Sequence, residues 1–207
     1  MNGKRKAKFI TFEGIDGCGK STQAKRLFEH LKRIGVPAKL TLEPGGTHIG
    51  SLIRNILLDP ENKHMDYMTE LFLYMADRSQ HIKEVIAPCL NNGIWVISDR
   101  FYDATVAYQG FGRGIDKEFI EMLNKKVCQD IQPDITFLLD CPVKVAMERK
   151  SKNDRFDQED LLFYQKVREG YLYIAEKYQK RVIVLDATRS IYEIEKVVLK
   201  IVKNYLF

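Results

Sequence analysis

The feature that most constrains this chain is a glycine-rich turn near its N-terminus. Residues 14–21 read GIDGCGKS and satisfy the pattern G-x-x-x-x-G-K-[ST]. The apolar run FITFE (9–13) precedes the turn, and a helical pattern follows it. In this context backbone N–H groups point at phosphate oxygens and the helix N-terminus adds a partial positive charge. The turn therefore predicts a nucleoside triphosphate site, rather than a turn that merely joins a strand to a helix.

Individual positions of the turn have expected parts in that site. Lys20 should reach the β- and γ-phosphates of the nucleotide, and Ser21 should hold Mg²⁺. The residues expected to bind the nucleotide are Gly14, Ile15, Asp16, Gly17, Cys18, Gly19, Lys20, Ser21 and Thr22.

The apolar pattern along the chain predicts the fold class. Short runs rich in β-branched residues recur at 9–13, 38–42, 94–98, 134–139 and 181–186. They are continuously apolar, as strands buried on both faces of a parallel sheet are. Helical patterns separate them at 21–34, 48–58, 67–90, 117–130, 143–149, 158–178 and 191–206. The alternation predicts a three-layer α/β domain over residues 1–207, with five parallel strands and ligands at their carboxyl ends.

Composition narrows the partners and the compartment. A net charge of +5 suits nucleotides but is too small to indicate nucleic acid binding. No apolar run approaches the roughly 18 residues that a membrane helix needs. The cysteines show no C-x-x-C spacing, so we expect reduced thiols and a cytoplasmic protein. They are Cys18, Cys89, Cys128 and Cys141.

Three further segments distinguish among the P-loop proteins. EPGGT (43–47) follows the second predicted strand, DRFYDATVAYQG (99–110) follows the third, and a charged run (148–171) contains DRFDQED. With FEGIDGCGKST at the start and DATRSIYEI near the end, the chain resembles the bacterial thymidylate kinases over nearly its whole length. The resemblance implies a P-loop kinase fold, Mg²⁺, a homodimer, and transfer of the γ-phosphoryl group of ATP to dTMP, giving dTDP.

A charged pair follows the third predicted strand. Asp99 could accept a hydrogen bond from Mg²⁺-bound water, and Arg100 could bridge two reacting phosphates. A structural ion pair is the alternative interpretation. The resemblance places Asp99 near the metal, Arg100 on phosphate, and Asp16 near the sugar or the transferring phosphate.

The resemblance also assigns an acceptor site for dTMP. It implies that Arg54 grips the monophosphate, while Glu43 and Pro44 belong to the loop near the thymine methyl group. Tyr74 and Arg78 are spaced i, i+4 and share a helix face. From this face Tyr74 could stack on the base and Arg78 could donate to a ring carbonyl.

Three residues of the 99–110 segment complete this expected site. Thr105 and Gln109 resemble the polar residues that complete thymine recognition. Tyr108 resembles the tyrosine that crowds the 2′ position of the sugar and favours deoxyribose. A site built on such donors should reject cytosine most strongly.

The cation for the transferring phosphate is expected in a lid at about 149–157. Some thymidylate kinases carry an arginine where this chain has Gly17, so the lid run must supply it. Arg155 is the first candidate and Arg149 the second, in a run that also holds Lys150 and Lys152. Leu42 stands where the bacterial pattern usually has arginine. Other nucleoside monophosphate kinases, and P-loop switches or ATPases, remain the alternative functions.

Overall fold

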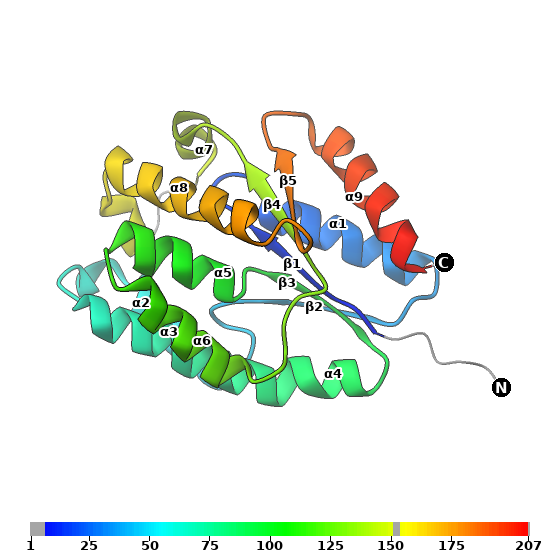
Figure 1. Cartoon of the computed structure of the whole chain (residues 1–207), viewed down its shortest axis with the longest axis horizontal. Coiled ribbons are helices and arrows are strands. Elements are labelled where there is room, and N and C mark those ends of the chain that lie inside the picture. The colour runs from blue at the N-terminus through cyan, green and yellow to red at the C-terminus, as the bar shows by residue number, and fades with distance from the viewer. Residues whose placement is uncertain (1–6, 151–153, 207) are drawn as a thin grey trace.

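The computed structural model describes residues 7–150 and 154–206 of the chain (Figure 1). Its centre is a parallel sheet in the order β2-β3-β1-β4-β5. The strands are β1 (Phe9–Glu13), β2 (Ala38–Leu42), β3 (Trp95–Asp99), β4 (Ile135–Asp140) and β5 (Val182–Asp186). The predicted five-stranded parallel α/β fold is confirmed.

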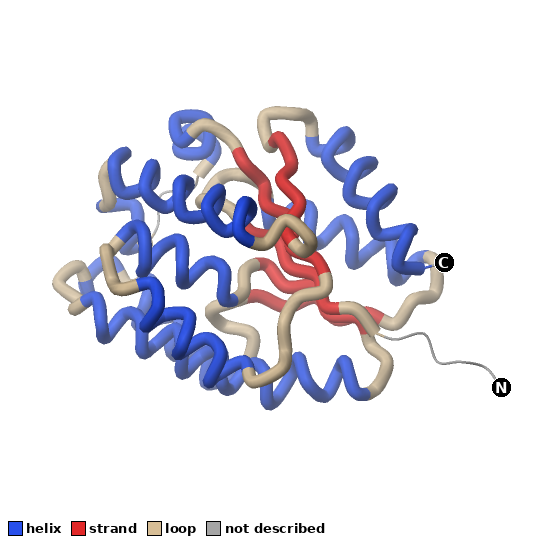
Figure 2. The backbone as a smooth tube through the Cα atoms, in the orientation of Figure 1, coloured by secondary structure: helices blue, strands red, loops and turns tan. Residues whose placement is uncertain are grey.

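Helices cover both faces of the sheet. α1 (Lys20–Arg33) and α9 (Ile191–Leu206) lie on one face, while α3 (Tyr67–His81), α4 (Ala87–Asn91) and α8 (Leu161–Lys177) lie on the other (Figures 1 and 2). The remaining α-helices are α2 (His48–Leu58), α5 (Tyr102–Thr105), α6 (Lys117–Cys128) and α7 (Val143–Arg149). In the described ranges, no helix is long and apolar enough to cross a membrane.

The three inner strands β1, β3 and β4 are buried because helices cover the sheet on both sides, whereas the edge strands β2 and β5 are partly exposed. Every residue of β1 is buried, and so are the first five of β4. Phe12 of β1 and Phe137 of β4 pack with their ring centroids 5.3 Å apart at the centre of the main hydrophobic cluster. This explains why their sequences are continuously apolar rather than alternating.

Strand register brings the sequence motifs to one edge of the sheet. Asp99, the last residue of β3, lies in register with Phe12 of β1 and with Leu42 of β2. The turn after β1, the loop after β2 and the segment after β3 therefore leave the sheet at the same level. This edge is where an open parallel sheet binds its ligands.

The predicted helix at 67–90 is interrupted. α3 ends at His81, a π-helical turn η2 (Ile82–Ile86) follows, and α4 begins at Ala87. Pro88 explains the break, because it has no N–H for the helix ladder and its ring clashes with the carbonyl four residues earlier.

Three more short elements surround the predicted motifs. A π-helical segment, η3 (Val106–Gly112), continues α5, and the sequence reading assigned no helix there. Two 3₁₀ turns, η1 (Pro60–Asn62) and η4 (Arg155–Gln158), lie next to each other although 92 or more residues of chain separate them in sequence. η4 follows the three residues of the predicted lid, 151–153, that lie outside the described ranges.

Candidate active site

The glycine-rich turn after β1 has a backbone that only glycine suits. Gly14, Gly17 and Gly19 have φ values of 137°, 84° and 96°. A Cβ at Gly17 would lie 2.0 Å from the carbonyl oxygen of Ala146 in α7. An arginine therefore cannot replace Gly17 without displacing α7, so a cation for the phosphates has to come from another element.

The turn and the start of α1 line an open cleft. Seven of the nine predicted nucleotide-binding residues line it, and the other two, Gly14 and Ile15, are buried. Lys20 is 6% exposed, and its Nζ donates to the carbonyl oxygen of Ile15 at 3.0 Å. The lysine is thus held over the turn, in position to meet a phosphate.

Ser21 and Asp99 meet at the floor of this cleft. The hydroxyl of Ser21 donates to Asp99 Oδ2. Asp99 Oδ1 is buried and has no hydrogen-bond partner among the described residues. No group of three or more His, Cys, Asp or Glu side chains that could hold a metal occurs in residues 7–150 and 154–206. A hydroxyl and one carboxylate nevertheless suit Mg²⁺, which commonly takes its other ligands from phosphates and water.

Arg100 is fixed from several sides. Its backbone has φ of 72°, in the left-handed region that residues other than glycine rarely adopt. Its guanidinium donates to Asp16 at 2.6 Å, to the Tyr108 hydroxyl at 3.0 Å and to the Tyr171 hydroxyl at 2.8 Å. These contacts hold the guanidinium in one orientation before any ligand binds.

Asp16 stays ionised in this arrangement. Burial alone would raise its pKa, but the positive charges of Arg100, Lys20 and Lys150 together hold the pKa well below its usual range. The carboxylate lies 3.7 Å from Lys20 and 3.9 Å from Lys150.

A buried carboxyl group lies behind Arg100. Glu13 accepts hydrogen bonds from the backbone N–H of Phe101 at 2.7 Å and from the Tyr171 hydroxyl at 3.0 Å. Burial, and next the charge of Asp103, raise the pKa of Glu13 from 4.5 to about 8, against the opposing effect of Arg100. Sequence reasoning did not single out Glu13. The one feature that could have indicated a functional role was a charged residue at the end of a buried strand.

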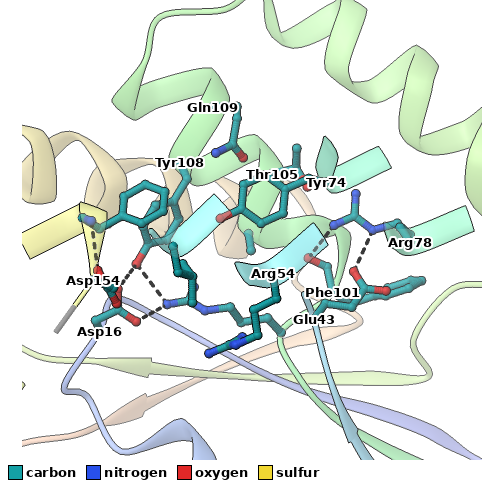
Figure 3. A pocket seen from close by; sticks show the side chains of 14 residues that line it. Asp16, Glu43, Arg54, Tyr74, Arg78, Phe101, Thr105, Tyr108, Gln109 and Asp154 are labelled. Atoms are coloured by element: carbon teal, nitrogen blue, oxygen red, sulfur yellow. Dashed lines mark hydrogen bonds and ion pairs between the residues drawn. The ribbon is translucent and has the colours of Figure 1, made fainter. Parts of the chain in front are cut away.

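A second cavity adjoins the first. Eight of the nine predicted substrate-binding residues line this acceptor pocket. Figure 3 shows Tyr74 at its centre with Arg54 on one side and Gln109 on the other. The lining residues from the predicted set are Glu43, Arg54, Tyr74, Arg78, Arg100, Thr105, Tyr108 and Gln109.

Pro44 supports this pocket from outside. Its carbonyl oxygen accepts a hydrogen bond from Arg54 at 2.8 Å, and the Glu43–Pro44 peptide bond is cis. Glu43 in turn accepts from Arg78 at 2.9 Å, and Arg78 also donates to Asn124 and to the carbonyl oxygen of Phe101. A further contact joins Arg78 Nη1 to Met75 Sδ at 3.8 Å. Since a guanidinium has five N–H groups, one N–H on Nη2 is left for a ligand.

The structure corrects the expectation for Arg155. This arginine is 3% exposed, donating to the carbonyl oxygen of Leu57 at 2.9 Å and to Glu70 at 2.5 Å. Its charge is paired inside the protein and does not face the phosphate cleft. The carboxylate of Glu70 on a neighbouring helix draws it inward, which a lid sequence read alone does not reveal.

Arg149 and Lys150 occupy the position expected of Arg155. Both line the phosphate cleft, and Arg149 donates to the carbonyl oxygen of Ala187 at 2.8 Å. Lys150 is held by Asp157 at 2.6 Å and by the Tyr164 hydroxyl at 2.8 Å. Sequence reasoning missed Lys150 as a site residue, although it belongs to the cationic run; Lys152 lies outside the described residues.

Comparisons with known proteins show the family of this chain. A family model described as thymidylate kinase matches residues 12–198. A thymidylate kinase of Trichlorobacter lovleyi is 49% identical over 189 residues, covering 87% of this chain and 89% of the relative. A thymidylate kinase of Sulfurihydrogenibium sp. is 45% identical over 197 residues, covering 95% of this chain and 97% of the relative. The crystal structure of thymidylate kinase from Ehrlichia chaffeensis is similar with a TM-score of 0.81 and 38% identity, covering 95% of this chain and 98% of that chain.

Proposed function

The chain belongs to the thymidylate kinase family and transfers the γ-phosphoryl group of ATP to dTMP, and we propose that it does so where its two cavities meet. The observation that carries this proposal is that Asp16 and Arg100 line both the phosphate cleft and the acceptor pocket. Two nucleotides in these cavities would bring their phosphates together at Arg100. A site for hydrolysis alone has no need of the second cavity.

In the proposed arrangement the donor occupies the phosphate cleft. The backbone N–H groups of residues 14–22 and the ammonium group of Lys20 hold the phosphates of ATP. Ser21 and Asp99 would hold Mg²⁺, and the buried Asp99 Oδ1, which has no hydrogen-bond partner among the described residues, supports this assignment. When bound, the ion would neutralise phosphate charge. Arg149, which lines the same cleft, lies on the donor side.

The acceptor occupies the second cavity. Arg54 takes the monophosphate of dTMP, Tyr74 stacks on the thymine ring, and Arg78 donates to a ring carbonyl. Thr105 supports this assignment, because its buried hydroxyl has no partner among the described residues. Tyr108, whose hydroxyl lies 3.2 Å from Asp16, restricts the space beside the sugar.

Transfer requires positive charge on the moving phosphoryl group. Arg100 reaches the junction of the two cavities from β3, and Lys150 reaches Asp16 from the end of α7. We assign to Lys150 the part that sequence reasoning gave to Arg155. Catalysis here consists of positioning and electrostatic stabilisation, and no covalent enzyme intermediate is needed.

An assay with several acceptors tests this proposal. ADP formation is followed with ATP and each of dTMP, dUMP, dCMP, dGMP and AMP. We expect dTMP to give the highest kcat/KM, dUMP a lower value and dCMP a lower one still. A higher kcat/KM for another acceptor would indicate a different nucleoside monophosphate kinase. ADP formation independent of any acceptor would indicate an ATPase or a switch.

The proposal extends to the assembly, the domain organisation and the compartment. Apolar side chains on α2 and α3 are about half exposed, which supports a homodimer through these helices: Ile49 (46%), Leu52 (53%), Ile56 (47%) and Phe72 (51%).

The match over residues 12–198 supports a single catalytic domain over 1–207. All four cysteines are free thiols, in keeping with a cytoplasmic protein.

A further inference from the structure

A buried ionic cluster lies directly behind the acceptor pocket. Glu70 of α3 is 0% exposed and accepts a hydrogen bond from Gln109 Nε2 at 2.7 Å. It also pairs with Arg113 at 3.1 Å and with Arg155 at 2.5 Å. Of these four residues only Gln109 lines the pocket. The proposed mechanism does not use Glu70, yet its contacts decide how Gln109 can lie.

The cluster fixes which atom of Gln109 faces a ligand. A carboxylate that neutralises two guanidinium groups can only accept hydrogen bonds. The Gln109 atom that meets Glu70 must therefore be the amide nitrogen, and the amide oxygen lies on the other side of the planar group. Gln109 Oε1 has no hydrogen-bond partner in the described part of the chain, and the side chain borders the cavity (Figure 3).

An acceptor at this point distinguishes pyrimidines. Thymine and uracil carry an N3–H donor beside the O4 acceptor, whereas cytosine carries an N3 acceptor beside an amino donor. Arg78 offers only donors, and Gln109 as held offers an acceptor. Thr105 does not discriminate, because its hydroxyl can donate or accept. Thymine presents its O4 acceptor to Arg78 and its N3–H donor to the Gln109 oxygen. Cytosine would place its amino donor against the donors of Arg78 and its N3 acceptor against the Gln109 oxygen.

We propose that Glu70 is a positioning residue that sets the specificity of the acceptor pocket, by holding the Gln109 carboxamide with its oxygen toward the base. The inference rests on the proposed function, since it takes the base to lie beside Arg78 and Gln109. It assigns the preference for thymine over cytosine to a residue that does not touch the substrate.

The substitution Glu70→Gln tests the proposal sharply. Arg113 Nη2 and Arg155 Nη2 both donate to Glu70 Oε2, so in the variant the side-chain oxygen turns to them and the NH₂ group faces Gln109. This orientation gives up the longer contact from Arg113 Nε to Oε1, at 3.2 Å. Gln109 must then turn its oxygen toward position 70 and present its NH₂ group to the base. We expect the ratio of kcat/KM for dTMP to that for dCMP to fall by at least about 10-fold, the change that one mismatched hydrogen bond of about 1.4 kcal/mol produces.

Arg155→Met is the matched control. It removes one ion pair of Glu70 but leaves the hydrogen bond from Gln109 intact, so the dTMP to dCMP ratio should stay within about twofold of that of the unchanged protein. An unaltered ratio in a folded Glu70→Gln protein would overturn the inference. An unchanged protein that fails to phosphorylate dTMP would instead overturn the proposed function.

A measurement on the unchanged protein covers the case in which Glu70→Gln does not fold. The side-chain NH₂ resonances of Gln109 are followed by nuclear magnetic resonance in the dTMP complex. Held by Glu70, these protons should exchange with solvent much more slowly than those of an exposed glutamine. Exchange as fast as that of an exposed glutamine would contradict the proposal.

Discussion

At the scale of the residue, Lys150 is the side chain whose proposed part in catalysis is most open to test. Its Nζ lies 2.6 Å from Asp157 and 3.9 Å from Asp16, which lines both cavities, and its side chain is 6% exposed. Lys150→Met should lower kcat by about 10²-fold with the KM for dTMP little changed, because the lost charge acts on the transferring group.

Two other variants show whether that loss is specific to the charge at position 150. Lys150→Arg, which keeps the charge, should retain most of the activity, and Lys166→Met, at an exposed position of α8, should not alter it. A kcat for Lys150→Met within twofold of the unchanged protein would remove Lys150 from its proposed role. Thermal unfolding of each variant separates this effect from a loss of stability.

The raised pKa of Glu13 predicts a pH dependence of stability. The folded protein holds a proton on this carboxyl group up to about pH 8, whereas the unfolded chain releases it near pH 4.5. Between these values the folded state binds more protons, so the Glu13 contribution to the free energy of unfolding falls as the pH rises.

Glu13→Gln removes the titrating group and keeps its shape. The free energy of unfolding, measured in urea at pH 5.5, 6.5 and 7.5, should therefore decline less with pH in this variant than in the unchanged protein. A constant difference between the two proteins over this range would show that Glu13 does not titrate there.

Some side-chain positions could be foreseen and others could not. Tyr74 and Arg78 share a helix face by spacing alone, and the structure places both at the acceptor pocket. Thr105 and Gln109 line the same pocket and were indicated by the resemblance. Arg155 could not be placed in the same way. Its direction depends on Glu70, which lies 85 residues away in sequence, and no local pattern reports that contact.

At the scale of the element, the exposed apolar face of α2 predicts self-association. Ile49, Leu52 and Ile56 are spaced i, i+3, i+7 and therefore lie on one side of this helix. Leu52→Glu should convert a dimer into a monomer, because a charge in an apolar interface loses its hydration. Sedimentation velocity measures the change, and an unchanged protein that sediments as a monomer would contradict the proposal.

Charge must be introduced elsewhere as a control. Met122→Glu changes a side chain of α6 that is 56% exposed and lies outside the proposed α2–α3 face. This variant should remain a dimer. If both variants dissociate, the interface is not confined to α2 and α3.

The strands were predicted more accurately than the helices, whose π-helical segments were not predicted. The predicted ranges 9–13 and 38–42 match β1 and β2, and every boundary of the other three strands lies within one residue of its predicted position. Buried parallel strands have an apolar composition that is easy to recognise. The π-helical segments η2 and η3 were not foreseen, because the extra residue in such a turn depends on tertiary packing rather than on local spacing.

At the scale of the whole molecule, the sheet order explains why distant motifs form one site. β1 lies between β3 and β4, so the glycine-rich turn is next to Arg100 on one side. α7, which follows β4, packs against Gly17 and ends at Arg149, directly before Lys150. Strand alternation predicts that motifs gather at one edge, but it does not specify which side chain of a loop turns inward.

We propose that donor and acceptor occupy two adjoining cavities at once and react directly at Asp16 and Arg100. Initial-rate kinetics with both substrates varied tests this direct transfer. Because both nucleotides must be bound before transfer, double-reciprocal plots at several dTMP concentrations should give intersecting lines. Parallel lines, accompanied by ADP release before dTMP is added, would indicate a phosphorylated enzyme and contradict direct transfer between the two nucleotides.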